Sequence, residues 1–483
     1  MQRGDFDDDA ASNTNPNQSA STRPSRVNND RGIYIGNGSA GWTWTGGQRS
    51  ALVLGPPRSG KTSSLVIPNI LASQGAVVST STKPDVMVAT APTRSRKGWT
   101  FLYDPSGEIE CPPGVERIGW SPLTSARSWD GAVVTADAMV RASRSAGALT
   151  AEAHWTERAA ALLSPLLHAA SVAELPMRDV LRWIDRHDAT AALEILGTDV
   201  PNAESAADLL TGIVATDSRE QSGIWSTASG VLAAYRTEGA LASTTAPPLD
   251  MNALCTGTNT LYICSTGRRQ RQFDPLVVAT LGDVRDAVYQ HSLAGHQVAP
   301  TLMALDEMAN IAPIPDLPAM VSEGGGQGLL VLACLQDLSQ ARARWGAAAD
   351  GFLTLFSSTV VLPGIADTKT LRDLSALAGD HEVPTTTLIH SAARWGRRHT
   401  SASVSPLRQP RLPVDAIARG TAERAVVLGP SNELSEVHLT PAHRCSPWRE
   451  MLPHTRSHTA SRATNLTLTR YDRAESTGLD RGR

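Results

Sequence analysis

Short apolar runs that end at Gly, Pro, Ser or Asp recur along most of the chain, which is the pattern of buried strands leading into loops of an α/β sheet. Helical patterns lie between these runs, so the chain is predicted to form an α/β fold with a largely parallel sheet. The candidate strands are Ala51 to Leu54, Ala76 to Ser79, Trp99 to Tyr103, Thr260 to Cys264, Thr301 to Leu305, Leu329 to Cys334, Ser358 to Leu362 and Ala425 to Leu428.

The stretch from about residue 130 to 236 has a different pattern, because its apolar residues recur at helical spacing and no strand pattern interrupts them. Leu162 and Leu166 fall on one helical face, and Val180 and Ile184 repeat the pattern in a second segment. We therefore expect an all-α domain inserted between the early and the late strands of the sheet.

The two ends of the chain are polar and have almost nothing to bury, so they are expected to be disordered. The predicted organisation has five parts. These are a disordered segment (1–31), the first part of the sheet-containing domain (32–129), the all-α insertion (130–245), the second part of the sheet-containing domain (246–450) and a disordered tail (451–483).

The composition is that of a globular protein without an overall basic character. The 483 residues are 41% hydrophobic and 19% charged, with a formal net charge of -3, so any contact with nucleic acid must be local. The five cysteines are scattered and form no CxxC pair, which indicates neither a disulfide framework nor a zinc site. No apolar run approaches the roughly 18 to 20 residues that a membrane helix needs.

A phosphate-binding loop is predicted directly after the strand Ala51 to Leu54. The segment GPPRSGKT fits the pattern GxxxxGK[ST], and the residues after it can open a helix. Backbone amides of such a loop surround a β-phosphate, Lys61 reaches the β- and γ-phosphate oxygens, and the Thr62 hydroxyl can bind magnesium. The expected nucleotide-binding residues are Gly55, Pro56, Pro57, Arg58, Ser59, Gly60, Lys61, Thr62 and Ser63.

Three polar side chains follow later strands of the same sheet. Asp306 and Glu307 come directly after the strand Thr301 to Leu305, at the carboxyl edge where α/β sheets bind ligands. Asp306 is expected to hold magnesium, and Glu307 to orient or deprotonate the attacking water, so ATP hydrolysis is the predicted reaction. Gln336 follows the strand Leu329 to Cys334 and either senses the γ-phosphate or caps the next helix.

Six motifs together resemble the TraG/TraD-type coupling proteins of conjugation systems, with the actinobacterial branch closest. The motifs are GPPRSGKT (55–62), VVSTSTKPD (77–85), DPSGE (104–108), GWSPL (119–123), LMALDEMANIAP (302–313) and LACLQDLSQARARWG (332–346). The resemblance implies a RecA-like P-loop ATPase in a homo-hexameric ring, with ATP and Mg2+ between subunits and DNA in the central channel. It also implies an all-α domain that faces the cytoplasm and recruits a relaxase.

Two features depart from the family pattern. Family members usually begin with transmembrane helices, which this sequence lacks, so we expect a cytoplasmic chain held at the inner face of the plasma membrane by type IV secretion channel proteins or a separate membrane anchor. Some relatives also place an arginine before the strand of Gln336, aimed at the neighbouring subunit's nucleotide, where this chain has Gly325 or Gln327. Arg342 or Arg344 could replace it, or their helix could be an ordinary solvated one.

Three local basic clusters are candidate DNA contacts, because a motor that ignores base sequence grips backbone phosphates with a few cations per subunit. Trp395 could also stack on a base. Each cluster could instead be a solvated loop. The candidates are Arg94, Arg96, Lys97, Arg268, Arg269, Arg394, Trp395, Arg397 and Arg398.

The sequence therefore predicts an ATP-driven coupling protein that pumps relaxase-bound DNA, expected to be the single-stranded transfer strand, to a type IV secretion channel. Two alternatives stay open. One is an ATP-binding docking module that selects secretion substrates with little hydrolysis, which the absent arginine favours. The other is an FtsK-like double-strand DNA translocase, against which the helical block argues.

Overall fold

The computed structural model describes residues 31–143, 150–198, 203–265, 270–296, 299–392 and 398–453. The ends that the sequence predicts to be disordered, 1–31 and 451–483, lie almost entirely outside these ranges. Arg31 is the first residue of the first strand, and Met451 is the last residue of the last helix.

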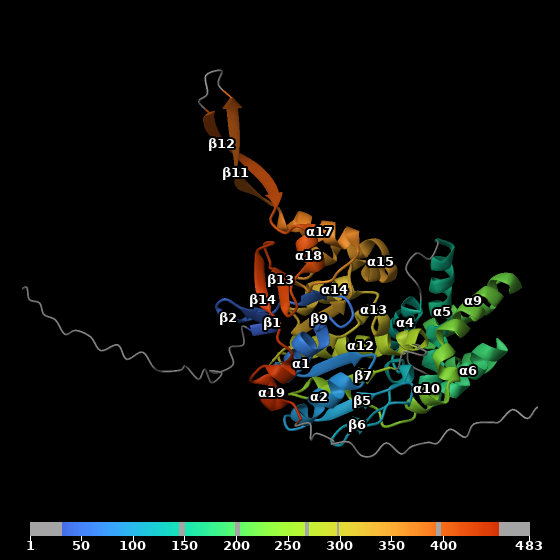
Figure 1. The fold of residues 1–483 in the computed structure, drawn as a ribbon. Helices are drawn as coiled ribbons and strands as arrows, with labels where there is room; N and C mark the ends of the chain where they lie inside the picture. Colours follow the sequence, from blue (N-terminus) through green and yellow to red (C-terminus); the bar gives the residue numbers. More distant parts are fainter. Residues whose placement is uncertain are drawn as a thin grey trace, which may run out of the picture.

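One large sheet forms the centre of the described structure (Figure 1). Its strand order is β2-β1-β14-β13-β10-β3-β9-β8-β4-β7-β5-β6, and neighbours pair in parallel from β10 to β6. The four strands at the other end pair antiparallel. The strands are β1 (Arg31–Gly38), β2 (Gly41–Gly46), β3 (Ala51–Leu54), β4 (Val77–Ser81), β5 (Thr100–Tyr103), β6 (Glu116–Arg117), β7 (Thr260–Cys264), β8 (Thr301–Leu305), β9 (Leu329–Leu335), β10 (Ser358–Val361), β13 (Arg424–Leu428) and β14 (Leu434–His438).

All eight predicted strands are confirmed, and each lies in this sheet. Seven of them belong to the parallel part, where helices cover both faces and every residue of β3, β4, β7, β8 and β9 is buried. The sequence analysis missed β1, β2, β6 and β14. These strands are short or partly exposed, so they lack the continuous apolar run by which the others were recognised.

Alternate residues of each parallel strand pack into two different cores. In β3, Leu52 and Leu54 join the core on the side of the long helix α12 (Gln270–Leu293), whereas Ala51 and Val53 face the helices that follow the phosphate-binding loop. This alternation is what buries the strands on both sides and holds their carboxyl ends at one edge.

The other helices of this domain connect the strands or cover the sheet. Within the described residues, none is both long enough and apolar enough to cross a membrane. They are α1 (Ile67–Ala72), α2 (Asp85–Arg94), α3 (Pro122–Ser125), α11 (Met251–Cys255), α13 (Met308–Ile311), α14 (Leu317–Gly324), α15 (Leu338–Trp345), α16 (Phe352–Leu355), α17 (Thr368–Ala378), α18 (Val414–Arg419) and α19 (Trp448–Met451).

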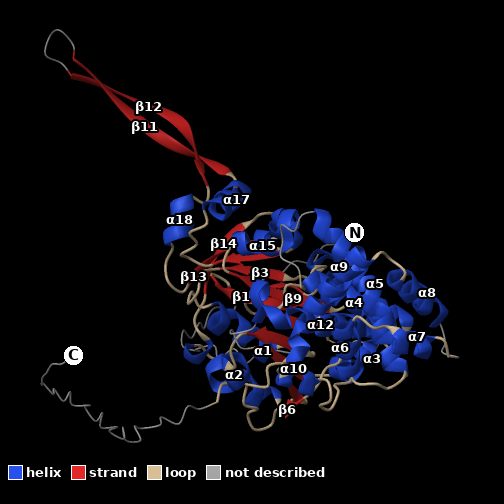
Figure 2. Cartoon of the chain, turned by 90° about the vertical axis from the view of Figure 1, so that its right-hand side faces the viewer, coloured by secondary structure: helices blue, strands red, loops and turns tan. Residues whose placement is uncertain are grey.

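A block of helices gathers on one side of the sheet, as predicted from its helical periodicity (Figure 2). No strand occurs among its described residues between 130 and 245. The block packs on α12, and its apolar residues belong to the same continuous core as that face of the sheet. Its helices are α4 (Trp129–Ala142), α5 (Thr150–Val172), α6 (Met177–Arg186), α7 (Thr190–Leu196), α8 (Ala203–Val214), α9 (Ser218–Val231) and α10 (Glu238–Ser243).

A separate two-stranded ribbon projects away from the body (Figures 1 and 2). Its strands, β11 (Asp380–Ala392) and β12 (Arg398–Pro410), pair only with each other, and the ribbon lies between α17 and α18 in the chain. The sequence analysis did not predict this ribbon, because its Ser/Thr-rich strands bury almost nothing.

Arg94, a predicted DNA contact, is completely buried and holds together loops at the amino edge of the sheet. Its guanidinium donates hydrogen bonds to Thr260 Oγ1 (2.7 Å) and to the carbonyl oxygens of Ser73 (2.8 Å), Gly75 (2.9 Å) and Thr258 (2.8 Å). Burial lowers its pKa to about 10, so the side chain still carries its charge at neutral pH. The assignment of Arg94 to DNA was therefore wrong, because its donors are used inside the fold.

We predict that Arg94→Met destabilises the protein by about 3 kcal/mol or more, because it leaves several buried carbonyl oxygens without a donor. Urea unfolding measures this change. Arg96→Met is the matched control, because Arg96 is exposed two residues away and should change stability by less than about 0.5 kcal/mol. Equal stability of the two variants would contradict a structural role for Arg94.

Asp283 of α12 is hydrogen-bonded to the segment that leads into the helical block, and it is predicted to give stability a particular pH dependence. Its carboxylate accepts hydrogen bonds from Trp120 Nε1 (2.7 Å) and Ser125 Oγ (2.8 Å). Burial raises its pKa to about 6, despite the two hydrogen bonds that lower it. The folded state thus holds this proton more tightly than the unfolded chain, so the stabilisation is full below about pH 4 and is lost as the pH rises through about 6.

Asp283→Asn, which stays neutral, should therefore gain stability relative to the wild type by about 3 kcal/mol between about pH 4 and about pH 7. Parallel urea titrations at several pH values measure the difference. Other titrating groups, including buried Asp274, are present in both proteins, so their contributions cancel in the difference in unfolding free energy. A difference that does not change with pH would show that folding does not raise the pKa of Asp283.

Candidate nucleotide-binding site

The predicted phosphate-binding loop leaves β3 and closes tightly on itself. Gly55 N donates a hydrogen bond to Leu335 O (3.2 Å) at the end of β9. A Cβ atom at Gly55 would lie 2.7 Å from Ser59 Oγ, so only glycine fits there. Gly60 has a φ of +97°, which favours glycine as well. The loop then opens a π-helical turn at Thr62–Val66, which leads into α1.

Lys61 lies buried across this loop. Its ammonium donates hydrogen bonds to the carbonyl oxygens of Gly55 (2.5 Å) and Pro56 (3.0 Å). Burial lowers its pKa, and the nearby charges of Asp306 and Glu307 act in the opposite direction. Because its hydrogen-bond acceptors are neutral carbonyls, the positive charge is still available to an anion in the loop.

Asp306 follows β8 directly and is hydrogen-bonded to the loop. Thr62 Oγ1 donates to Asp306 Oδ2 at 2.7 Å, although the two residues are 244 positions apart. Asp306 is 5% exposed, and its Oδ1 is buried without a hydrogen-bond partner. Burial raises the pKa of this carboxyl group. A hydroxyl and a carboxylate with a spare buried oxygen are the donors that a hard divalent cation prefers, so these residues fit Mg2+.

Glu307 adopts a left-handed backbone conformation, with φ 51° and ψ 43°. Such a conformation costs energy in a non-glycine residue and is concentrated at functional sites. The Glu307 carboxylate accepts hydrogen bonds from Thr82 Oγ1 (3.3 Å) and Asn310 Nδ2 (3.4 Å), so its orientation is held from two sides. The sequence analysis missed Thr82 and Asn310 as site residues. The position of Thr82 directly after β4, a neighbour of β8, was the available signal.

Gln336 follows β9, which lies between β3 and β8 in the sheet. It is thus placed between the phosphate-binding loop and the acidic pair. The alternative that Gln336 caps the next helix is not observed, because Asp337 caps α15 by accepting hydrogen bonds from Ser339 N and Gln340 N. The backbone N–H of Gln336 donates to Gln340 Oε1 at 2.9 Å.

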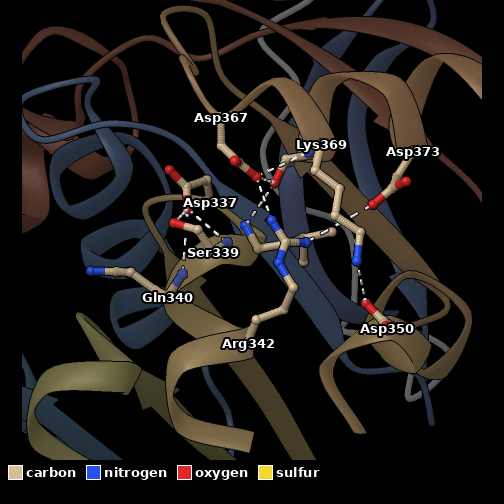
Figure 3. Close-up of polar contacts among 10 residues, drawn as sticks. Asp337, Ser339, Gln340, Arg342, Asp350, Asp367, Lys369 and Asp373 are labelled. Carbon is tan, nitrogen blue, oxygen red and sulfur yellow. Dashed lines mark hydrogen bonds and ion pairs between the residues drawn. The ribbon is translucent and has the colours of Figure 1, made fainter. Parts of the chain in front are cut away.

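One of the two positions considered for an arginine before β9, Gly325, cannot carry a side chain. A Cβ atom at Gly325 would lie 2.0 Å from Gln48 O, so the backbone excludes every side chain at this position. Both possible substitutes are held within the subunit. Arg342 pairs with Asp367 at 2.5 Å (Figure 3). Arg344 pairs with buried Asp274 at 3.1 Å and also donates to a backbone carbonyl.

Among the remaining DNA candidates, those that the structure describes lie away from this site. Arg96 and Lys97 are exposed near the amino ends of the parallel strands, at the sheet edge opposite the nucleotide site. The residues that lie outside the described ranges are Arg268, Arg269, Arg394, Trp395 and Arg397. Arg398 lies on β12 of the projecting ribbon, in register with Ala392.

Solved structures of the bacterial conjugative coupling protein TrwB have a similar fold. The unbound monoclinic form of TrwBdeltaN70 matches with a TM-score of 0.61 and 19% identity, covering 81% of this chain and 84% of that chain. TrwB in complex with ADP and Mg2+ matches with a TM-score of 0.59 and 19% identity, covering 82% and 86%. The likeness at this identity supports the RecA-like P-loop fold.

A family comparison extends to most of the sequence. No curated protein sequence matches the chain. The model of the family described as type IV secretory system conjugative DNA transfer matches residues 3–411, which include the phosphate-binding loop, the acidic pair and Gln336. The chain therefore belongs to the family of type IV secretory system conjugative DNA-transfer proteins, as the sequence motifs indicated.

Proposed function

We propose that this protein hydrolyses ATP with Mg2+ and uses the energy to move DNA to a type IV secretion channel. The observation that carries the proposal is the hydrogen bond between Thr62 and Asp306, beside a buried carboxylate oxygen that has no partner. Lys61 and Glu307 lie at the same edge of the sheet. TrwB, which has the same fold, has been solved with ADP and Mg2+ and with a non-hydrolysable ATP analogue.

Each side chain has a separate role in this proposal. Thr62 and Asp306 hold the magnesium ion, which neutralises phosphate charge when bound. Lys61 binds the β- and γ-phosphate oxygens. Glu307, oriented by Thr82 and Asn310, positions the attacking water and accepts its proton. Gln336 changes position with the presence or absence of the γ-phosphate, and this shift is transmitted to α15.

The assembly and its partners belong to the same proposal. A homo-hexameric ring with ATP between subunits and DNA in the channel is supported by the family membership. We infer that residues 130–245 are an inserted all-α domain that recruits a relaxase carrying the transfer strand. The shared core with α12 supports a domain that moves with the motor rather than an independent one. Channel proteins or a separate anchor would hold the ring at the membrane.

A docking module that binds ATP but hydrolyses it little is a second candidate. The specific observation in its favour is that Gly325 excludes an arginine and that Arg342 and Arg344 are paired within the subunit. An arginine from a neighbour raises the rate of such enzymes by several orders of magnitude. The complete set of Lys61, Asp306 and Glu307 favours hydrolysis instead.

We predict that two substitutions in the site impair different steps, one ATP binding and the other ATP turnover. Lys61→Ala should weaken ATP binding, because the phosphate oxygens lose their cation. Glu307→Gln should leave ATP affinity unchanged and lower turnover at least about 100-fold, because the amide cannot accept the proton from water. A fluorescent ATP analogue measures affinity, and phosphate release measures turnover.

Glu323→Gln is the matched control for the second substitution. It makes the same chemical change at an exposed position of α14, outside the site, and should leave both quantities as in the wild type. If Glu307→Gln turned over ATP as fast as this control, Glu307 would not be the catalytic carboxylate.

The proposed ring predicts that activity depends on assembly. Isolated chains should be mainly monomeric at low concentration, because a modest polar interface must overcome the entropy of association. The ATPase activity per chain should then rise with protein concentration and with single-stranded DNA, a polyanion that several subunits can share. Sedimentation measured beside ATPase tests this. Full activity in a monomer, unaffected by DNA, would favour the docking module.

A further inference from the structure

The ribbon of β11 and β12 is long and has no partner in the described structure. Its 13 paired positions run from Asp380↔Pro410 to Ala392↔Arg398, a length of about 40 Å at about 3.4 Å per residue. Every described side chain of the ribbon except Val383 is exposed. Two-stranded ribbons are marginally stable in water by themselves, so a surface outside this subunit is needed to cover it.

The chemistry of the ribbon favours a polyanion. Residues 380–411 include five arginines against two acidic residues, Asp380 and Glu382, which lie at the base of the ribbon, in a chain whose net charge is -3. Each strand also contributes four Ser or Thr residues, whose hydroxyls can donate to phosphate oxygens. Arg408 lies opposite Glu382 in the ladder, and its side chain is exposed and within ion-pair distance of no described carboxylate. The major groove of DNA is wide enough for a two-stranded ribbon.

A second copy of the chain is a poorer occupant. Among the described side chains of the ribbon, the large apolar residues that are clearly exposed are Val404 (65%) and Leu407 (50%). Interfaces between subunits have an apolar, densely packed centre, which these two described residues do not by themselves provide.

The base of the ribbon is firmly attached to α17. Gly379 ends that helix with a φ of +71°, and β11 begins at the next residue. Arg411, which follows β12, donates from its backbone N–H to Gly379 O (2.8 Å) and from Nε to Asp380 O (3.3 Å). These bonds close the base, so a movement of α17 carries the ribbon with it.

Helix α17 is in turn bonded to the helix that follows Gln336 (Figure 3). Asp367 caps α17 through Thr370 N (3.0 Å) and pairs with Arg342 of α15 (2.5 Å). Leu338 N, in the first turn of α15, donates to Thr370 Oγ1 (3.1 Å). Because both pairs are largely shielded from water, they hold the two helices together more firmly than exposed pairs would.

We propose that the β11–β12 ribbon is a DNA-binding arm whose position is set by the nucleotide through Gln336, α15 and α17. This inference rests on the proposed function and names the surface through which it acts. A shift of Gln336 with the γ-phosphate moves α15 through the bond to Gln340, and the α15–α17 contacts transmit the shift to the base of the arm. The arm contacts the phosphates of DNA independently of base sequence.

The first experiment removes the charge of the arm in the full chain. Arg398→Ser/Arg408→Ser is compared with Arg178→Ser/Arg219→Ser, which removes two exposed arginines from α6 and α9. Anisotropy of a fluorescein-labelled single-stranded oligonucleotide, and of its duplex, is followed over a salt series. The arm variant should bind more weakly, and its slope of log affinity against log salt should fall by about 1 to 2. The control should keep the wild-type slope.

Three outcomes would overturn the proposal in different ways. A wild type that binds neither oligonucleotide would overturn the proposed function together with the arm. Equal oligonucleotide binding by the wild type and the arm variant would overturn the proposal that the ribbon binds DNA, but not the proposed function. Unchanged DNA affinity with loss of assembly in sedimentation would show that the arm contacts a neighbouring subunit.

The second experiment breaks the connection between α15 and α17. In the wild type, DNA affinity should differ between the state with ADP and the state with a non-hydrolysable ATP analogue. Arg342→Ala should abolish this difference while leaving nucleotide affinity unchanged. Lys369→Ala is the control, since its pair with Asp350 (3.0 Å) also joins α17 to a neighbouring segment but is exposed (Figure 3). A difference preserved in Arg342→Ala would show that this connection does not couple nucleotide to DNA.

Discussion

The parallel pairing of β9 with β3 on one side and β8 on the other is the constraint on which the nucleotide site depends. Parallel strands end at one edge, so three loops that are distant in the sequence emerge side by side. Gly55 N is bonded to Leu335 O at the end of β9, and Thr62 is bonded to Asp306 directly after β8, so the phosphate-binding loop is held to the ends of both strands. The strained backbone of Glu307 is tolerated because this framework holds it.

Several arginines that the sequence suggested for contacts with DNA or with a neighbouring subunit instead form bonds inside this subunit. Arg94 satisfies carbonyl groups at the amino edge of the sheet, Arg342 joins α15 to α17, and Arg344 neutralises buried Asp274. Burial raises the pKa of Asp274 to about 7, against the attraction of Arg344, so this pair sits in a poorly solvated place. A neighbouring subunit that needed a cation from this chain would have to take it from another segment.

The amino and carboxyl ends of the parallel strands lie at opposite edges of the sheet, and these edges differ in their side chains. The amino edge, with Arg94, is closed by hydrogen bonds and serves stability. The carboxyl edge carries the nucleotide residues, and α15 and α17 connect this edge to the projecting ribbon. The helical block lies on the face of α12, away from the loop between β3 and α1. The proposed nucleotide site, the proposed DNA arm and the proposed recruitment surface therefore lie in separate regions around one sheet.

The sequence by itself determined the elements whose signals are local. Continuous apolar runs identified the parallel strands, and helical periodicity identified the helices between residues 130 and 245. The loop from Gly55 to Thr62 and the pair Asp306–Glu307 were predicted as site residues from their place after such runs. Only the tertiary structure decided which charges are free, which partners orient Glu307, and why Gly325 cannot be an arginine, because each depends on residues far away in the chain. The ribbon likewise escaped prediction, since strands that bury almost nothing leave no hydrophobic pattern to recognise.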